Sequence, residues 1–138
     1  MDLTLYQQQS EKLARFNRYL LDEAAQRLKH SADFTPMEEM GVLHSIQVII
    51  ENAIGKAKHI LKMKECSVPV SAYDSFELLA LNNLITKDDL IIWRKIIGLR
   101  NSIVHEYMEV NMEIVFDVVK NHYYQFVLDF LTTPFSDY

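Results

Sequence analysis

Hydrophobic residues recur at steps of three and four along most of the chain, a spacing that places them on one face of an α-helix. The first predicted helix runs from about Ser10 to Ser31 and is expected to stop in the polar segment SADFTP. Its predicted inward-facing positions are Leu13, Phe16, Leu20, Ala24 and Leu28. This single stripe predicts a helix that packs on one side only.

The second predicted helix carries three neighbouring start signals. Thr35 is a good N-cap, Pro36 suits the first helical position, and Glu38 completes a capping box with Thr35. The helix is expected to run to about Lys64. Its predicted buried stripe consists of Leu43, Ile46, Ile50, Ile54, Ala57 and Leu61.

Two further start signals follow a break near the middle of the chain. Ser71 and Asp74 have capping-box spacing and predict a short helix. Thr86 is the expected cap of the next helix, with Asp89 near its positive end, and this helix reaches about residue 107. The chain therefore carries cap signals for most of its predicted helices.

The last predicted helix spans Met112 to Leu131, with Asn111 as its N-cap. Its expected packing residues are Ile114, Val118, Phe126 and Phe130. The chain has only three glycines and three prolines, which favours long helices over strands and turns. We therefore predict an all-α fold, an up-down four-helix bundle with an additional short helix, forming a single domain over residues 1–138.

Composition narrows the class of protein. The 138 residues are 49% hydrophobic, enough to build a core, and the one cysteine, Cys66, excludes an internal disulfide and a multi-cysteine metal site. No apolar run approaches the roughly 18 residues of a membrane span, and the first residues lack a signal-peptide pattern, so we expect a cytoplasmic protein without membrane contact. The net charge of −5 restricts any nucleic-acid binding to a confined basic site.

The segment GLRNSIVHEY, residues 98–107, places polar side chains in an otherwise apolar helix. Arg100 and Tyr107 continue the stripe of Leu90, Trp93, Ile97 and Val104, and Asn101 lies four residues before His105. In a structural interpretation, Arg100 lays its stem on the core and extends its charge to water, and the other polar groups finish a helix. In a functional interpretation, a cation, an amide and an imidazole converge on a phosphate.

The functional interpretation is chemically coherent. A guanidinium matches phosphate oxygens, and an imidazole gives or takes a proton near neutral pH. RNA cleavage needs no metal, because the 2′-hydroxyl of RNA can be the nucleophile. A symmetric dimer would bring together Arg100 and His105 from each of two chains, with Arg94 and Lys95 adding positive charge for RNA binding.

The sequence offers little support for other chemistry. The remaining histidines are scattered, and no carboxylate stands three residues before a histidine, so a di-metal bundle is disfavoured. The chain has neither a glycine-rich phosphate loop nor a G-x-S-x-G pattern. We predict no metal and no cofactor.

The motif resembles that of HEPN ribonucleases, in the form found in HepT toxins of HEPN–MNT toxin–antitoxin systems. It reads Arg-Asn, three residues, His, one residue, Tyr. The resemblance continues through WRKIIGLRN, VPVSAYDSFELL and HSIQVIIENAIGKAKHIL, and the last of these includes Glu51. It covers roughly residues 40 to 110 well and the flanking segments by pattern only.

This resemblance implies a homodimeric, metal-independent endoribonuclease that cleaves RNA by internal attack. Arg100 and His105 would be the catalytic pair, and Asn101 would orient them. Tyr107 would be the residue to which a nucleotidyltransferase antitoxin of the MNT type, MntA, transfers AMP. The alternative interpretation of Tyr107 is a helix-end aromatic with its hydroxyl in water.

Three points stay open at this level. The chain could instead be a non-catalytic helical module that binds a nucleotide or a protein, or a helical ligand sensor. The lysines at 56, 58, 62 and 64 are predicted to form a solvated helix face, with contact to an RNA backbone as the alternative. Glu51 either pairs with a basic residue across the bundle or faces solvent.

Overall fold

The computed structural model describes residues 3–30, 33–105 and 110–138, and every element in these ranges is helical. The helices are α1 (Leu3–Lys29), α2 (Pro36–Met63), α3 (Ala72–Leu81), α4 (Lys87–His105), α5 (Met112–Lys120) and α6 (Tyr124–Thr132), followed by a short 3₁₀ turn, η1 (Phe135–Asp137). The described residues thus confirm the predicted all-α class.

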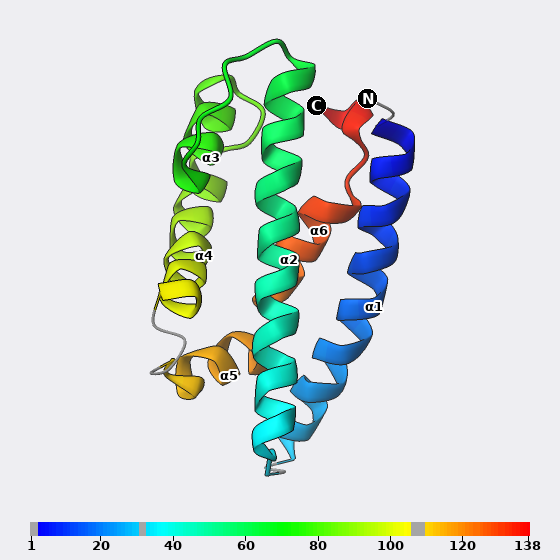
Figure 1. Cartoon of the computed structure of the whole chain (residues 1–138), viewed down its shortest axis with the longest axis vertical. Coiled ribbons are helices and arrows are strands. Elements are labelled where there is room, and N and C mark those ends of the chain that lie inside the picture. Colours follow the sequence, from blue (N-terminus) through cyan, green and yellow to red (C-terminus); the bar gives the residue numbers. More distant parts are fainter. Residues whose placement is uncertain (1–2, 31–32, 106–109) are drawn as a thin grey trace.

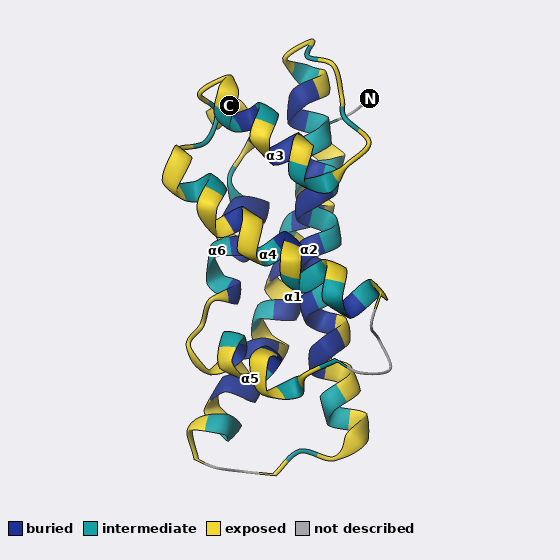
Figure 2. Cartoon of the chain, turned by 90° about the vertical axis from the view of Figure 1, so that its left-hand side faces the viewer, coloured by how far each residue is buried: buried dark blue, intermediate teal, exposed yellow. Residues whose placement is uncertain are grey.

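Helix α2 is the centre of the bundle. It packs against α1, α3, α4 and α6, and Figure 1 shows it between α1 on one side and α3 and α4 on the other. The start of α1 and the 3₁₀ turn η1 lie at the same end of the molecule (Figure 1). Seen from the α4 side, exposed residues cover the outward surfaces of α4 and α5, and buried residues face α2 (Figure 2). The long helices α1, α2 and α4 alternate in direction (Figure 1), which is the predicted up-down arrangement.

The cap signals are confirmed. Thr35 accepts a hydrogen bond from the Glu38 N–H, and the Glu38 carboxylate accepts one from the Thr35 N–H, so the capping box is complete. Ser71 accepts from the Asp74 N–H, and Thr86 accepts from the Asp89 N–H at 3.0 Å. These bonds satisfy donors that a helix start otherwise leaves without partners. The predicted buried stripe of α2 is also correct.

The predicted inward face of the first helix is wrong at Phe16 and Leu20, whereas Ala24 is buried and Leu13 and Leu28 pack partly buried against the core. Phe16 is 63% and Leu20 is 37% exposed, and the helix begins at Leu3 rather than near Ser10. The residues that turn inward are mostly small: Ser10, Ala14, Asn17, Leu21, Ala24 and Ala25. Small side chains let α1 approach α2 closely, and the hydroxyl of Ser45 donates to the side-chain oxygen of Asn17 at 2.6 Å across that contact. The face of α1 that packs inward is therefore the one with small side chains, and not the one with the large apolar side chains of Phe16 and Leu20.

The predicted last helix is divided into α5 and α6. His122 has φ 58°, and the N–H groups of His122 and Tyr123 donate to the carbonyls of Val119 and Val118. This is the hydrogen-bond pattern of a Schellman motif, which ends a helix with a left-handed residue. The sequence concealed the break because that residue is usually glycine. Of the predicted packing residues, Ile114 is 55% exposed and Phe130 is buried.

The predicted solvated face of lysines is wrong for Lys56, which is fully buried. Its ammonium donates to the carbonyl of Phe130 at 2.7 Å, to that of Leu131 at 3.3 Å and to that of Thr133. These carbonyls belong to the end of α6, where a helix leaves acceptors without partners. Burial lowers the pKa of Lys56 to about 8. Lys62 and Lys64 are exposed, and Lys58 is half-buried.

Candidate active site

Helix α4 is held against the bundle by Trp93. Its ring stacks on that of Phe76 of α3, with centroids 4.1 Å apart, and meets the Phe130 ring of α6 edge-on. Trp93 and Ile97 are buried, as the predicted stripe requires, and Arg100 follows them on the same side of the helix. The aromatic contacts therefore set the position from which Arg100 points toward α2.

Arg100 is held by two neighbours. Its Nε donates to Glu51 Oε1 at 2.6 Å, its Nη2 donates to Glu51 Oε2 at 3.4 Å, and its Nη1 donates to Asn101 Oδ1 at 3.1 Å. Among the described residues, these bonds engage three of the five N–H donors of a guanidinium, and the other two are available to a ligand. Arg100 therefore combines a fixed orientation with free donors, which suits binding of a phosphate.

Asn101 and His105 share the exposed face of α4. They are four residues apart, so their side chains lie one above the other. Arg100 and His105 are five residues apart, which separates them by roughly 140° around the helix and about 7.5 Å along it. His105 is exposed in the last turn of α4. Tyr107, the predicted site of modification, lies outside the described residues.

The two predicted RNA-contacting residues lie on different sides of α4. Arg94 is seven residues before Asn101 and eleven before His105, so it shares their face. Its Nη2 donates to the Tyr73 hydroxyl at 2.7 Å, and its guanidinium lies 5.1 Å from the Tyr73 ring centroid. Lys95 instead lines an apolar pocket on the other side.

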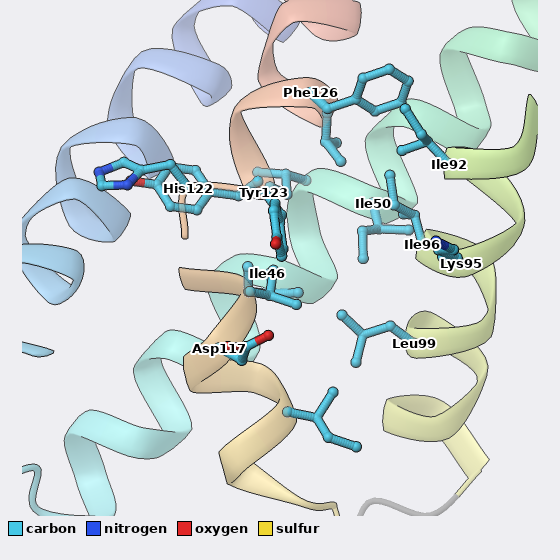
Figure 3. A pocket seen from close by; sticks show the side chains of 15 residues that line it. Ile46, Ile50, Ile92, Lys95, Ile96, Leu99, Asp117, His122, Tyr123 and Phe126 are labelled. Carbon is cyan, nitrogen blue, oxygen red and sulfur yellow. The ribbon is translucent and has the colours of Figure 1, made fainter. Parts of the chain in front are cut away.

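This apolar pocket has a volume of about 610 Å³ and lies between α2, α4, α5 and α6 (Figure 3). Its wall from α4 consists of Ile92, Lys95, Ile96 and Leu99. These residues lie on the side of the helix opposite Asn101. The pocket is therefore separate from the face that carries Asn101 and His105.

A polar pocket of about 340 Å³ adjoins Arg100 instead. It lies between the second half of α2, the segment that enters α3, and α4. Its lining comprises Glu51, Ile54, Lys58, Val70, Ser71, Ala72, Tyr73, Ile97, Arg100 and Asn101. Arg100 and Asn101 thus take part in both the motif and the wall of a cavity.

The sequence did not identify two features of this site. The partner of Glu51 was left open, although Glu51 and Arg100 each interrupt an apolar stripe, which is a signal that they face each other. Tyr73 carried no signal, because an aromatic residue near a helix start is ordinary. In the described ranges, no group of three or more His, Cys, Asp or Glu side chains could hold a metal ion. Nor does any helix there have the length and hydropathy to cross a membrane.

Comparison with known proteins identifies the family. The model of the family described as "Ribonuclease HepT-like" matches residues 9–131. The mRNA nuclease HepT of Shewanella oneidensis strain MR-1 is 42% identical over 90 residues, which are 65% of this chain and 66% of that protein. The match to this curated relative thus spans about two thirds of the relative's length.

Two solved structures share the fold. A crystal structure of a toxin–antitoxin with AMP-PNP matches with a TM-score of 0.73 at 30% identity, covering 91% of this chain and 96% of that one. The tri-AMPylated HEPN toxin of Shewanella oneidensis, in complex with MNT antitoxin, matches with a TM-score of 0.63 at 31% identity, covering 86% and 93%. The predicted resemblance is confirmed, and the chain belongs to the HepT-like ribonuclease family.

Proposed function

We propose that the chain is a metal-independent endoribonuclease toxin of a HEPN–MNT toxin–antitoxin system, with a catalytic cleft shared by two copies. Arg100 and His105 are the catalytic residues, and Asn101 orients Arg100. The observation that carries this proposal is the guanidinium of Arg100, on the helix that ends in the exposed His105. Glu51 and Asn101 hold this guanidinium, and two of its N–H donors are engaged by no described residue.

The reaction follows from these groups. The 2′-oxygen of RNA attacks the adjacent phosphorus, its proton passes to an imidazole, and the bond from phosphorus to the 5′-oxygen breaks as that oxygen takes up a proton. The products are a 2′,3′-cyclic phosphate and a 5′-hydroxyl. The free N–H groups of Arg100 stabilise the negative charge that builds up on the phosphorane oxygens. The nucleophile belongs to the substrate, so no metal-bound water is required.

A second copy of the chain completes this chemistry. Internal cleavage uses one group to accept a proton and one to supply it, and each chain offers a single His105 on this face. Gly98, on the same face of α4, is exposed, and no described atom comes within 4 Å of where its Cβ would lie, the backbone of α4 itself aside. An exposed helical glycine costs stability relative to alanine, and it permits close approach of another backbone. Gly98 therefore fits a face covered by a partner copy.

RNA binding would draw on the positive charge around the motif. Arg94 lies on the motif face, and we assign it to the RNA backbone. Lys95 points to the apolar side and would add only to the local potential. Since RNA and nucleotides are cytoplasmic, we place the protein in the cytoplasm.

Tyr107, two residues after His105, is the proposed site of AMP transfer by the MNT-type antitoxin. The tyrosine hydroxyl would attack the α-phosphate of ATP, with pyrophosphate as the leaving group. The added phosphate would bring negative charge to the motif and exclude RNA by repulsion and bulk. The AMPylated toxin among the related structures supports this assignment.

The test is cleavage of RNA by purified wild type, Arg100→Ala and His105→Ala in excess EDTA. We expect the wild type to leave cyclic-phosphate ends and each variant to lose at least about 10²-fold in rate, the size of a general acid–base contribution. Equal cleavage by all three proteins would reject the ribonuclease site. Absence of cleavage by the wild type would favour the non-catalytic binding module.

The shared cleft and its regulation have separate tests. Specific activity should fall on dilution, over the range in which sedimentation shows dimers dissociating. Activity that stays constant where only single chains remain would overturn the shared cleft. Co-expression with the cognate nucleotidyltransferase should add AMP masses to Tyr107, and a neutralised complex with unmodified Tyr107 would point to masking.

A further inference from the structure

The polar pocket beside Arg100 extends the motif face away from the end of α4. Its far wall is formed by Lys58 of α2 and by Tyr73 at the start of α3, and its near wall by Arg100 and Asn101. The polar share of its lining contrasts with the apolar pocket on the other side of α4. A ligand seated in it would touch Arg100.

Lys58 is held at the rim of this pocket. Its ammonium donates to the carbonyl of Val70 at 2.9 Å, and the side chain is half-buried. An ammonium has three N–H donors, so this bond leaves two for another acceptor. The contact with Val70 therefore reduces the conformational freedom that Lys58 would lose on binding an anion.

Tyr73 carries a second cation to the same rim. The guanidinium of Arg94 bonds to the Tyr73 hydroxyl and lies over its ring. Lys58 and Arg100 thus line one cavity, and Arg94 lies beside it on Tyr73. Among the described lining residues the carboxylate is Glu51, which Arg100 engages, while Glu77 faces Arg94 outside the lining. The like positive charges repel one another, and the chain as a whole is acidic, with a net charge of −5, so their proximity needs an explanation. An anionic ligand supplies one.

We propose that this pocket binds the nucleotide adjacent to the cleaved phosphodiester, with its phosphate at Lys58 and its sugar and base toward Tyr73. The volume, about 340 Å³, is at the small end of the ~300–1,000 Å³ range of ligand pockets, which suits one nucleotide rather than a duplex. This inference rests on the proposed ribonuclease function, because the pocket shares Arg100 with the cleavage site. It makes Lys58 and Tyr73 substrate-binding residues without a part in proton transfer.

Because the proposal assigns Lys58 and Tyr73 to substrate binding and not to the chemical step, we expect their substitution to change KM and not kcat. Lys58→Ala should raise KM for a short single-stranded RNA about tenfold, as expected for loss of a charged hydrogen bond, with kcat within about twofold of wild type. Lys58→Gln loses the charge but keeps a donor for the Val70 carbonyl, and it should behave like Lys58→Ala. The control is Lys62→Ala: Lys62 lies one turn further along α2, is exposed and does not line the pocket.

Direct binding is measured in the His105→Ala background with a fluorescein-labelled ten-nucleotide RNA, by anisotropy at several salt concentrations. Lys58→Ala should weaken binding about tenfold and reduce the slope of log K against log salt by about 0.7, the value for one phosphate on a single strand. Lys62→Ala should leave the affinity and the slope unchanged. Circular dichroism checks that every variant is folded.

The outcomes separate this inference from the proposed function. If wild type cleaves RNA and His105→Ala does not, while Lys58→Ala and Lys58→Gln bind and cleave like Lys62→Ala, the nucleotide site is wrong and the ribonuclease stands. If wild type cleaves no RNA, the proposed function itself fails. AMP is the second probe: displacement of the labelled RNA by AMP at equimolar concentration would assign the pocket to a free nucleotide and overturn the RNA assignment.

Discussion

The contact between Arg100 and Glu51 gives the most direct test of how this site is built. Glu51→Ala removes the acceptor of two of the three hydrogen bonds that orient the guanidinium and leaves only the bond to Asn101. Arg100 keeps its charge, but its side chain gains rotamers. We therefore expect RNA cleavage to fall although neither catalytic residue is changed.

Two magnitudes decide whether lost activity would reflect misfolding. The side chains of Arg100 and Glu51 are 25% and 39% exposed, so breaking the pair should cost about 1–2 kcal/mol, between the values for exposed and for buried pairs. If the free energy of unfolding of the wild type is at least ~5 kcal/mol, less than about 2% of the variant molecules would be unfolded. Misplacement of a catalytic group by about 1 Å can cost 10²-fold in rate. Positioning is thus the larger effect.

We would measure kcat for RNA cleavage and, on the same preparations, the free energy of unfolding in urea. Glu51→Ala should lower kcat about 10²-fold, and Glu51→Gln, which keeps an oxygen for the Nε–H, should lose less. The matched control is Glu38→Ala, which breaks the Arg27–Glu38 pair near the start of α2, where exposure is similar at 31% and 39%. It should lower the melting temperature and leave kcat unchanged. Wild-type activity in Glu51→Ala would refute the reasoning.

Three predictions concern the scaffold. Lys56→Met should lower the free energy of unfolding in urea by about 3 kcal/mol, because three carbonyls at the end of α6 lose their donor. A decrease below about 1 kcal/mol would mean that these carbonyls find other partners. Glu65→Gly should raise stability by about 1 kcal/mol, since Glu65 has φ 58° after α2, and Glu65→Ala should not. The hydrogen bond from Arg27 lowers the pKa of Glu38 from 4.5 to about 2. The ionised carboxylate therefore stabilises the fold above pH 4.5, and this contribution is lost as the pH falls from 4.5 to about 2. The free energy of unfolding of Glu38→Gln should fall less than that of wild type over this pH range.

Helix starts were predictable because their determinants lie within a few residues. Thr35 and Glu38 satisfy each other across three positions, and Ser71 and Thr86 each accept from an N–H three residues ahead. Helix ends were harder. The break at His122 is made by a local hydrogen-bond pattern, but a non-glycine residue in the left-handed conformation carries no warning in the sequence.

The order of Arg100, Asn101 and His105 along one helix is likewise local, and with the neighbouring segments it identified the family. The sequence by itself thus determined the helical class, most helix starts and the chemistry that the motif can perform. The extent of the domain and the roles of the motif residues stay predictions.

The tertiary structure decided which side chains meet across the bundle. Glu51 faces Arg100 over 49 residues of chain, and Lys56 meets the end of α6 over more than 70. The inward face of α1 was decided by how closely its small residues let α2 approach, and the polar pocket exists only where α2, α3 and α4 converge. Periodicity describes one helix at a time, whereas burial, ion pairing and cavities depend on the surface that a second helix presents.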